Sequence, residues 1–266
     1  MKERPRRERT SMGVEKIFIL PGGFLDIDRS IFLSAMDMGQ IIKAPVYSIL
    51  LQTSEGPILI DTGLNPDGVK DPEHAWGARA RLVPPKMTAA DDVRQRLQEL
   101  GLAMTDIRMV ILTHLHWDHT GTLRFFRHCP IVVQREEHRF AFNPDPFLAA
   151  PYMANHLDAG LQYQFVDGDC QVAPGVSLIK TPGHTPGHQS VAVSTDAGAR
   201  HIFAGDAAPL MVNLRGKIPL SNTYSARQCV DSLHRLDHLA QMLQARIHPS
   251  HDLEAYQSLN KSPLPL

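Results

Sequence analysis

The 266-residue chain has few cysteines, no long hydrophobic run and no excess of charge of either sign. Cys129, Cys170 and Cys229 lie far apart and form no CxxC pair, which excludes a disulfide scaffold and a cysteine-based zinc finger and is typical of a reducing cytosol. Because 27 Lys and Arg face 28 Asp and Glu, for a formal net charge of −1, no broad basic surface is expected. Nucleic acid and anionic membranes are therefore not expected as partners.

The sequence also shows neither a signal-peptide pattern nor a membrane-spanning pattern. The basic N-terminus is followed by an apolar run, Ile17–Leu20, that stops at Pro21, too early for a signal peptide. No apolar run approaches the roughly 18 residues that span a bilayer. We therefore expect a soluble cytoplasmic protein, with a flexible basic tail over residues 1–13 and a single domain over residues 14–266.

Short apolar runs alternate with helical patterns along the chain. Two pairs of runs flank turn sequences and predict hairpins, residues 46–53 with 57–61 and residues 190–195 with 201–204. This pattern indicates the α/β (α+β) class, with mixed sheets covered by helices rather than a barrel or a bundle.

Two helices are marked by their own signals. Thr88 and Asp91 resemble a capping box in front of one helix, and a longer helix follows Ser225. Cys229 lies on the apolar stripe of the longer helix, so we expect it in the core rather than as a reactive thiol.

The residue present in excess is histidine, with fourteen copies. The strand-like run that ends at Thr113 leads directly into His114-Leu115-His116-Trp117-Asp118-His119. Side chains two apart in an extended chain point the same way, so His114 and His116 can hold one ion. The following turn brings Asp118 and His119 to a second ion. A single zinc takes about four ligands, one of them water in catalytic sites, so this density of ligands predicts two ions.

Each half of such a centre needs a further imidazole, and two cations about 3.5–4 Å apart need an anionic bridge. His184 and Asp206 follow strand-like runs, and His251 follows the long helix. The predicted metal ligands are therefore His114, His116, Asp118, His119, His184, Asp206 and His251.

The other histidines are not expected to ligate. His188 is expected to make a structural hydrogen bond, and His248 has no vacant position to fill. The rest are expected at the surface or behind the ligands, namely His74, His128, His138, His156, His201, His234 and His238. Asp61, at the end of a strand-like run, is expected to orient a ligating histidine rather than to cap a turn.

The ligand pattern resembles the metallo-β-lactamase superfamily over roughly Val14 to Asp252. That resemblance implies an αββα sandwich of two mixed β-sheets flanked by helices, with the metals at one edge. The finer motifs resemble the quorum-quenching N-acyl-homoserine lactonases and the related pyridoxolactonases. Those motifs are Pro45–Ser48, Gly56–Gly63, Pro85–Thr88, Thr181–Ser190 and Ser250–Asp252. The resemblance implies that Asp206 bridges the metals and that Asp118 is both ligand and proton shuttle.

One position departs from these lactonases. They commonly have a tyrosine three residues after the bridging aspartate, where its hydroxyl helps to bind the lactone carbonyl, and this chain has Pro209. Either Tyr224, the nearest later tyrosine, takes over that role or the metals polarise the carbonyl unaided. Two roles stay open for Trp76 and Trp117, namely lining an acyl pocket and packing in the core.

We therefore expect a dinuclear-metal hydrolase that opens a lactone by attack of a metal-bridging hydroxide, with Asp118 as the catalytic proton donor. N-acyl-homoserine lactones are the expected substrates. Zinc suits the ligands, and cobalt, manganese or iron would also fit them. A pyridoxolactonase-like lactonase, a glyoxalase-II-like thioesterase and a non-hydrolytic redox or structural metal protein stay open as alternatives. The chain is expected to act as a monomer or a homodimer.

Overall fold

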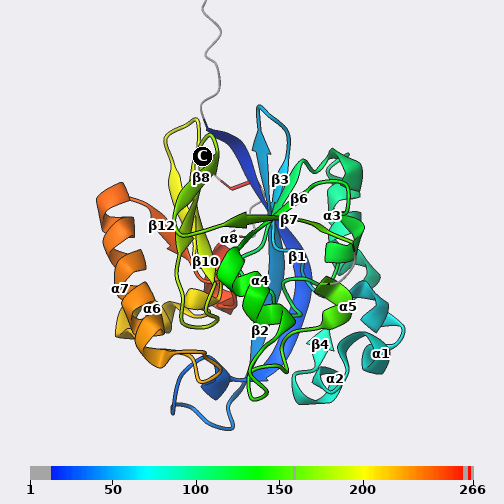
Figure 1. Ribbon diagram of the computed structural model, residues 1–266, viewed down its shortest axis with the longest axis vertical. Coiled ribbons are helices and arrows are strands. Elements are labelled where there is room, and N and C mark those ends of the chain that lie inside the picture. The colour runs from blue at the N-terminus through cyan, green and yellow to red at the C-terminus, as the bar shows by residue number, and fades with distance from the viewer. Residues whose placement is uncertain (1–12, 158–159, 260–262, 265–266) are drawn as a thin grey trace, which may run out of the picture.

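Two mixed β-sheets face each other at the centre of the structure, a computed structural model that describes residues 13–157, 160–259 and 263–264 (Figure 1). The seven-stranded sheet runs in the order β4 (Pro85–Lys86), β1 (Val14–Asp28), β2 (Ile41–Thr53), β3 (Ile58–Ile60), β5 (Met109–Ile111), β6 (Pro130–Gln134) and β7 (Gln162–Val166). The five-stranded sheet runs in the order β12 (Arg246–His248), β11 (Arg200–Phe203), β10 (Gln189–Ser194), β9 (Val176–Lys180) and β8 (Cys170–Ala173).

The alternation of side chains along the strands explains why both faces of the first sheet are covered. Ile58 and Ile60 of β3 pack between the sheets, whereas Leu59 between them packs on the outer face. Central strands buried on both faces read as continuous apolar runs, as β3 and its parallel neighbour β5 do. The core between the sheets is closed by Tyr256 and Leu259 of α8 (Leu253–Leu259).

Helices cover the two outer faces (Figure 1). Leu97 of α3 (Val93–Glu99) packs against the first sheet, and Leu233 of α7 (Ala226–Leu243) packs against the second. The other helices are α1 (Pro72–Trp76), α2 (Arg79–Leu82), α4 (Arg135–Phe142), α5 (Ala154–Leu157) and α6 (Met211–Gly216). Short 3₁₀ turns lie at Arg29–Ile31, Pro66–Val69, Ala89–Asp91, Met104–Asp106, Leu123–Phe125 and Gly205–Ala207. The predicted αββα sandwich is confirmed.

The expected hairpins form as β2–β3 and β10–β11, and Cys229 is buried in the core as expected. Two local predictions were incomplete. The run Ile17–Leu20 is part of a 15-residue strand, because a bulge at Pro21–Gly23 lets pairing with β2 resume at Phe24. The Thr88–Asp91 capping box closes a 3₁₀ turn, and the following helix has its own cap at Asp92.

No helix in the described part of the chain is both long enough and apolar enough to cross a membrane. Residues 1–12 of the expected tail lie outside the described residues, so the division into a tail and a domain over 14–266 stays a prediction.

Candidate metal centre

The ends of separate strands bring the predicted ligands to one edge of the sandwich. His114 follows β5 in the first sheet, and His184 follows β9 in the second. Asp206 lies in the 3₁₀ turn after β11, and His251 follows β12. All the predicted ligands are buried. The structure therefore places residues more than 130 positions apart around one point, as the sequence analysis expects.

The ligand atoms form three groups, in each of which they lie within 4.8 Å of one another. The first half-site consists of His114, His116 and His184, and the second half-site of Asp118, His119 and His251. A third group, His114, His119 and Asp206, joins them. These groupings correspond to the two half-sites and the bridge expected from the sequence, and the assignment of the residues as ligands stays a prediction.

Asp206 presents one carboxylate oxygen to each half-site. Its Oδ2 is 4.0 Å from His114 Nε2 and 3.6 Å from His184 Nε2. Its Oδ1 is 3.5 Å from His119 Nε2 and 3.2 Å from His251 Nε2, and accepts a hydrogen bond of 2.7 Å from Ser250 Oγ. A carboxylate placed between two groups of imidazoles has the geometry of a bridging ligand.

The far nitrogens of three of the predicted ligand rings are held by acceptors outside the cluster. Asp61 Oδ2 lies 2.8 Å from His119 Nδ1, the carbonyl of Asn222 lies 2.9 Å from His184 Nδ1, and the carbonyl of Pro45 lies 2.9 Å from His251 Nδ1. These contacts turn Nε2 of each ring toward the cluster. His116 is turned the other way, with Nδ1 facing inward, 3.0 Å from His184 Nε2.

The donors present fit a metal ion. His114 Nε2 and His119 Nε2 are buried and have no hydrogen-bond partner among the described residues. A buried polar atom left without a partner is costly, and an ion at this point would satisfy both. Burial and the neighbouring histidines also hold the pKa of His114 and of His116 well below its usual value. These two rings are therefore neutral, which is the form that binds metals.

Asp61 has the orienting role expected of it. Besides its contact with His119, its Oδ1 accepts from the backbone N–H of Thr113 at 2.8 Å and its Oδ2 accepts from Thr113 Oγ1 at 2.8 Å. The residue lies at φ 56°, a conformation that aspartate tolerates better than most residues. Asp61 thus links the end of β3 to the loop that carries the ligands.

The histidines outside the ligand set fall largely as expected. His188 Nδ1 lies 2.9 Å from Thr181 Oγ1, which confirms a structural hydrogen bond. His248 Nε2 lies 2.9 Å from His201 Nδ1, away from the ligands. The expectation for His201 was wrong, because the ring is buried in this pair between β11 and β12 rather than lying at the surface or behind a ligand. His156 is buried behind the ligand loop, 3.2 Å from Thr120 Oγ1.

The structure distinguishes between the roles left open for the two tryptophans and Tyr224. Trp76 and Trp117 are both buried in one apolar cluster, and Trp76 Nε1 donates to the carbonyl of Asn65. Tyr224 is 44% exposed, and its ring packs edge-on against Phe140. These contacts place the two tryptophans in the core and leave Tyr224 partly exposed, with its backbone N–H donating to the carbonyl of His184.

Three residues near the centre were missed by the sequence analysis. Glu137 is fully buried on α4, Tyr152 packs its ring edge-on against His116, and Arg79 lies with its guanidinium 5.6 Å from the ring of Trp117. The available signal for Glu137 was its position four residues before Ala141, on the face of α4 that packs inward. Nothing in the local sequence marks Tyr152 or Arg79.

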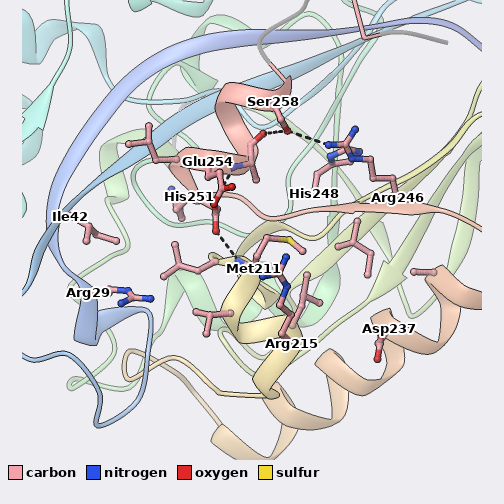
Figure 2. Close-up of a pocket in the computed structure, with 18 of the residues that line it drawn as sticks. Arg29, Ile42, Met211, Arg215, Asp237, Arg246, His248, His251, Glu254 and Ser258 are labelled. Atoms are coloured by element: carbon pink, nitrogen blue, oxygen red, sulfur yellow. Dashed lines mark hydrogen bonds between the residues drawn. The ribbon is translucent and has the colours of Figure 1, made fainter.

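A cavity of about 1150 Å³ lies between α6, α8 and β12 (Figure 2). Met211 and Arg215 of α6 face it from one side, and Glu254 and Ser258 of α8 face it from the other. Of the predicted ligands only His251 lines it, so this cavity is separate from the space between the two half-sites.

Residues 42–251 match the Metallo-beta-lactamase superfamily. The chain belongs to this superfamily. It is 32% identical to the N-acyl homoserine lactonase AiiA of Bacillus thuringiensis subsp. kurstaki over 95% of this chain and 99% of that protein. It is 29% identical to the N-acyl homoserine lactonase AttM of Azorhizobium caulinodans over 85% of this chain and 88% of that protein.

Solved structures give the same result. An N-acyl homoserine lactone hydrolase with the product N-hexanoyl-L-homoserine at its catalytic metal centre superposes with a TM-score of 0.86 and 32% identity, covering 94% of this chain and 98% of that one. The dizinc lactonase AidC, 20% identical with a TM-score of 0.69, shares the fold. The resemblance read from the sequence is confirmed.

Proposed function

We propose that this chain is a dinuclear-metal hydrolase that opens the ring of a lactone, with N-acyl-homoserine lactones as its substrates. The observation that carries the proposal is the Asp206 carboxylate, which directs one oxygen to each half-site. The relatives of this chain that are named N-acyl homoserine lactonases match it over nearly its whole length, which supports the substrate class.

The ligands divide between two ions. The first half-site would hold one ion and the second half-site would hold the other. Asp206 would contribute to both. When bound, two divalent ions, zinc by the donor set, lower the pKa of a water toward about 7 and polarise the ester carbonyl. The chain contributes the rigid frame, because each ligating ring is buried and most are fixed from behind by a hydrogen bond.

Asp118 is the residue that we assign to proton transfer. Hydroxide adds to the lactone carbonyl carbon, and collapse of the tetrahedral adduct breaks the bond to the ring oxygen. The ring oxygen leaves as an alkoxide and gains the proton that the added hydroxyl loses. Both oxygens of Asp61 accept hydrogen bonds, and both oxygens of Asp206 face histidines. Asp118 Oδ2 lies 3.7 Å from His119 Nε2 and from His251 Nε2, so this carboxylate is inside the centre without a role as a bridge. The products are one hydroxyl group and one carboxylate.

A substrate panel tests the proposal. We expect the metal-loaded protein to open N-hexanoyl-homoserine lactone and to release one acid equivalent per ring, and EDTA to abolish this activity. Pyridoxolactone, a glutathione thioester and a β-lactam serve as the competing substrates. Turnover of the thioester or the β-lactam alone would contradict the proposal, as would a protein with both ions bound that opens no lactone.

A further inference from the structure

We propose that Glu137 positions the first half-site and leaves the second half-site untouched. The inference rests on the proposed two-metal function. It assigns to one buried carboxylate on α4 the task of holding together the two loops that carry His114, His116 and His184. Glu137 is not itself close enough to the cluster to be grouped with the ligands.

The carboxylate of Glu137 accepts from both loops at once. Its Oε1 accepts from the backbone N–H of Leu115 at 3.0 Å, and Leu115 is the residue between His114 and His116. Its Oε2 accepts from Thr185 Oγ1 at 2.5 Å and from the backbone N–H of Gly187 at 3.2 Å. Thr185 directly follows His184. One side chain therefore fixes the spacing between ligand loops that come from different sheets.

A second route leads from Glu137 to the same half-site. The hydroxyl of Tyr152 lies 3.4 Å from Glu137 Oε1, and the ring of Tyr152 packs edge-on against His116 with the centroids 4.8 Å apart. The loop after His184 is also fitted closely to α4, because a Cβ on Gly187 would lie 2.1 Å from the backbone nitrogen of Glu137. The loop after His184 therefore lies directly against the part of α4 that carries this carboxylate.

The surroundings of Glu137 are unusual for an acid that only stabilises the fold. The side chain is fully buried, and its polar partners within the described residues are all neutral. A buried carboxylate without a cation costs free energy, and an apolar replacement of similar volume is often no worse for stability. The contacts it makes instead serve the geometry of the loops.

The second half-site is held by other groups. His119 is oriented by Asp61, and His251 by the carbonyl of Pro45. Within the described part of the chain, the polar contacts of Glu137 lead to Leu115, Tyr152, Thr185 and Gly187, and not to Asp61 or Pro45. Loss of the Glu137 carboxylate should therefore weaken one ion and spare the other.

Metal titration of the full chain tests this separation. Cobalt is added to metal-free protein and followed by its visible absorption in three backgrounds, namely the unmodified chain, His251→Ala, which keeps the first half-site, and His116→Ala, which keeps the second. We expect Glu137→Ala to weaken binding roughly 10–100-fold in the His251→Ala background, the range seen when groups that orient metal ligands are removed. In the His116→Ala background we expect no change. Glu137→Gln should lie between, since its amide oxygen can still accept from one loop.

Two controls separate positioning from general damage. Glu136→Gln removes the neighbouring exposed carboxylate, which pairs with Lys180, and should leave both ions unaffected. Leu97→Ala destabilises the apolar cluster on the outer face of the first sheet, which includes Leu115 but none of the predicted ligands, and so reports the effect of lost packing alone. Equal weakening of both half-sites by Glu137→Ala, no weakening of either, or the same loss in Leu97→Ala would overturn the inference. Unmodified protein that binds fewer than two ions would instead overturn the two-metal function on which it rests.

Discussion

At the scale of single residues, three carboxylates in the centre are distinguished by their partners. Asp61 accepts hydrogen bonds from Thr113 and orients His119, so both of its carboxylate oxygens are occupied by structural contacts. Asp206 faces both half-sites. Asp118 is left as the carboxylate whose loss should affect proton transfer most directly.

We therefore expect Asp118→Asn to lower kcat for lactone opening by roughly two or more orders of magnitude, a typical contribution of a general acid. An amide of nearly the same shape can still contact an ion but has no proton to exchange. Metal content is measured on the same sample, and only a variant that keeps both ions tests the point. Full activity with both ions present would show that the proton comes from another group.

Tyr224 allows a second test at this scale. Its side chain is 44% exposed and packs on Phe140, so we expect Tyr224→Phe to leave kcat/KM for lactones nearly unchanged. A hydroxyl that bound the lactone carbonyl would contribute about 1–3 kcal/mol, or roughly a 5- to 150-fold loss on removal. A fall of that size with both metals bound would show that Tyr224 has replaced the tyrosine expected at Pro209.

At the scale of elements, the ligand loop depends on its packing against the loop after β3. The backbone N–H of Gly121 donates to the carbonyl of Gly63, and a Cβ on Gly121 would lie 2.1 Å from the backbone nitrogen of Asn65. We expect Gly121→Ala to lose about 3 kcal/mol of unfolding free energy, at the upper end of the usual cost of overpacking, because backbone cannot rotate away.

Gly101→Ala is the matched control for that variant. No atom of the described residues lies within 4 Å of the methyl added at Gly101, whose φ is 75°. The variant therefore measures the cost of backbone strain without a steric clash, about 1–2 kcal/mol. Urea denaturation of both variants supplies the comparison. A loss in Gly121→Ala smaller than that in Gly101→Ala would show that the contact at Gly121 is not tight.

The elements also show what a sequence can and cannot reveal. The ligand motif from His114 to His119 lies within six consecutive residues. The alternation of side chains along a strand and the ligand preferences of metals were therefore enough to predict it. The extent of β1 was not predicted, because Pro21–Gly23 ends a strand in most contexts and is a bulge here only through pairing with β2. Glu137 was missed because its partners lie 15 to 50 positions away and only the fold brings them together.

At the scale of the whole molecule, buried neutral histidines couple folding to pH. Burial lowers the pKa of His156 to about 4, helped by Arg124 and Arg79. The unfolded chain binds this proton near pH 6.5 and the folded chain only near pH 4, so the unfolding free energy falls as pH drops through that window. The total is on the order of 3 kcal/mol, at 1.36 kcal/mol for each pKa unit.

We expect His156→Gln to remove that part of the acid dependence. The slope of unfolding free energy against pH between about 4 and 6.5, measured on metal-free protein, should become shallower by up to about 1.4 kcal/mol per pH unit. His74→Gln, an exposed position, is the control and should leave the slope unchanged. An unchanged slope in His156→Gln would show that folding does not lower the pKa of this ring.

The most direct measurement of the central claim is the metal content of the folded chain, determined by elemental analysis for the unmodified protein and for Asp206→Ala. Because Asp206 lies between the half-sites with one oxygen toward each, we expect about two ions per chain in the unmodified protein. Asp206→Ala should lose at least one ion while its circular dichroism stays that of the folded protein. One ion or none in fully loaded unmodified protein, or two ions retained by Asp206→Ala, would contradict the account.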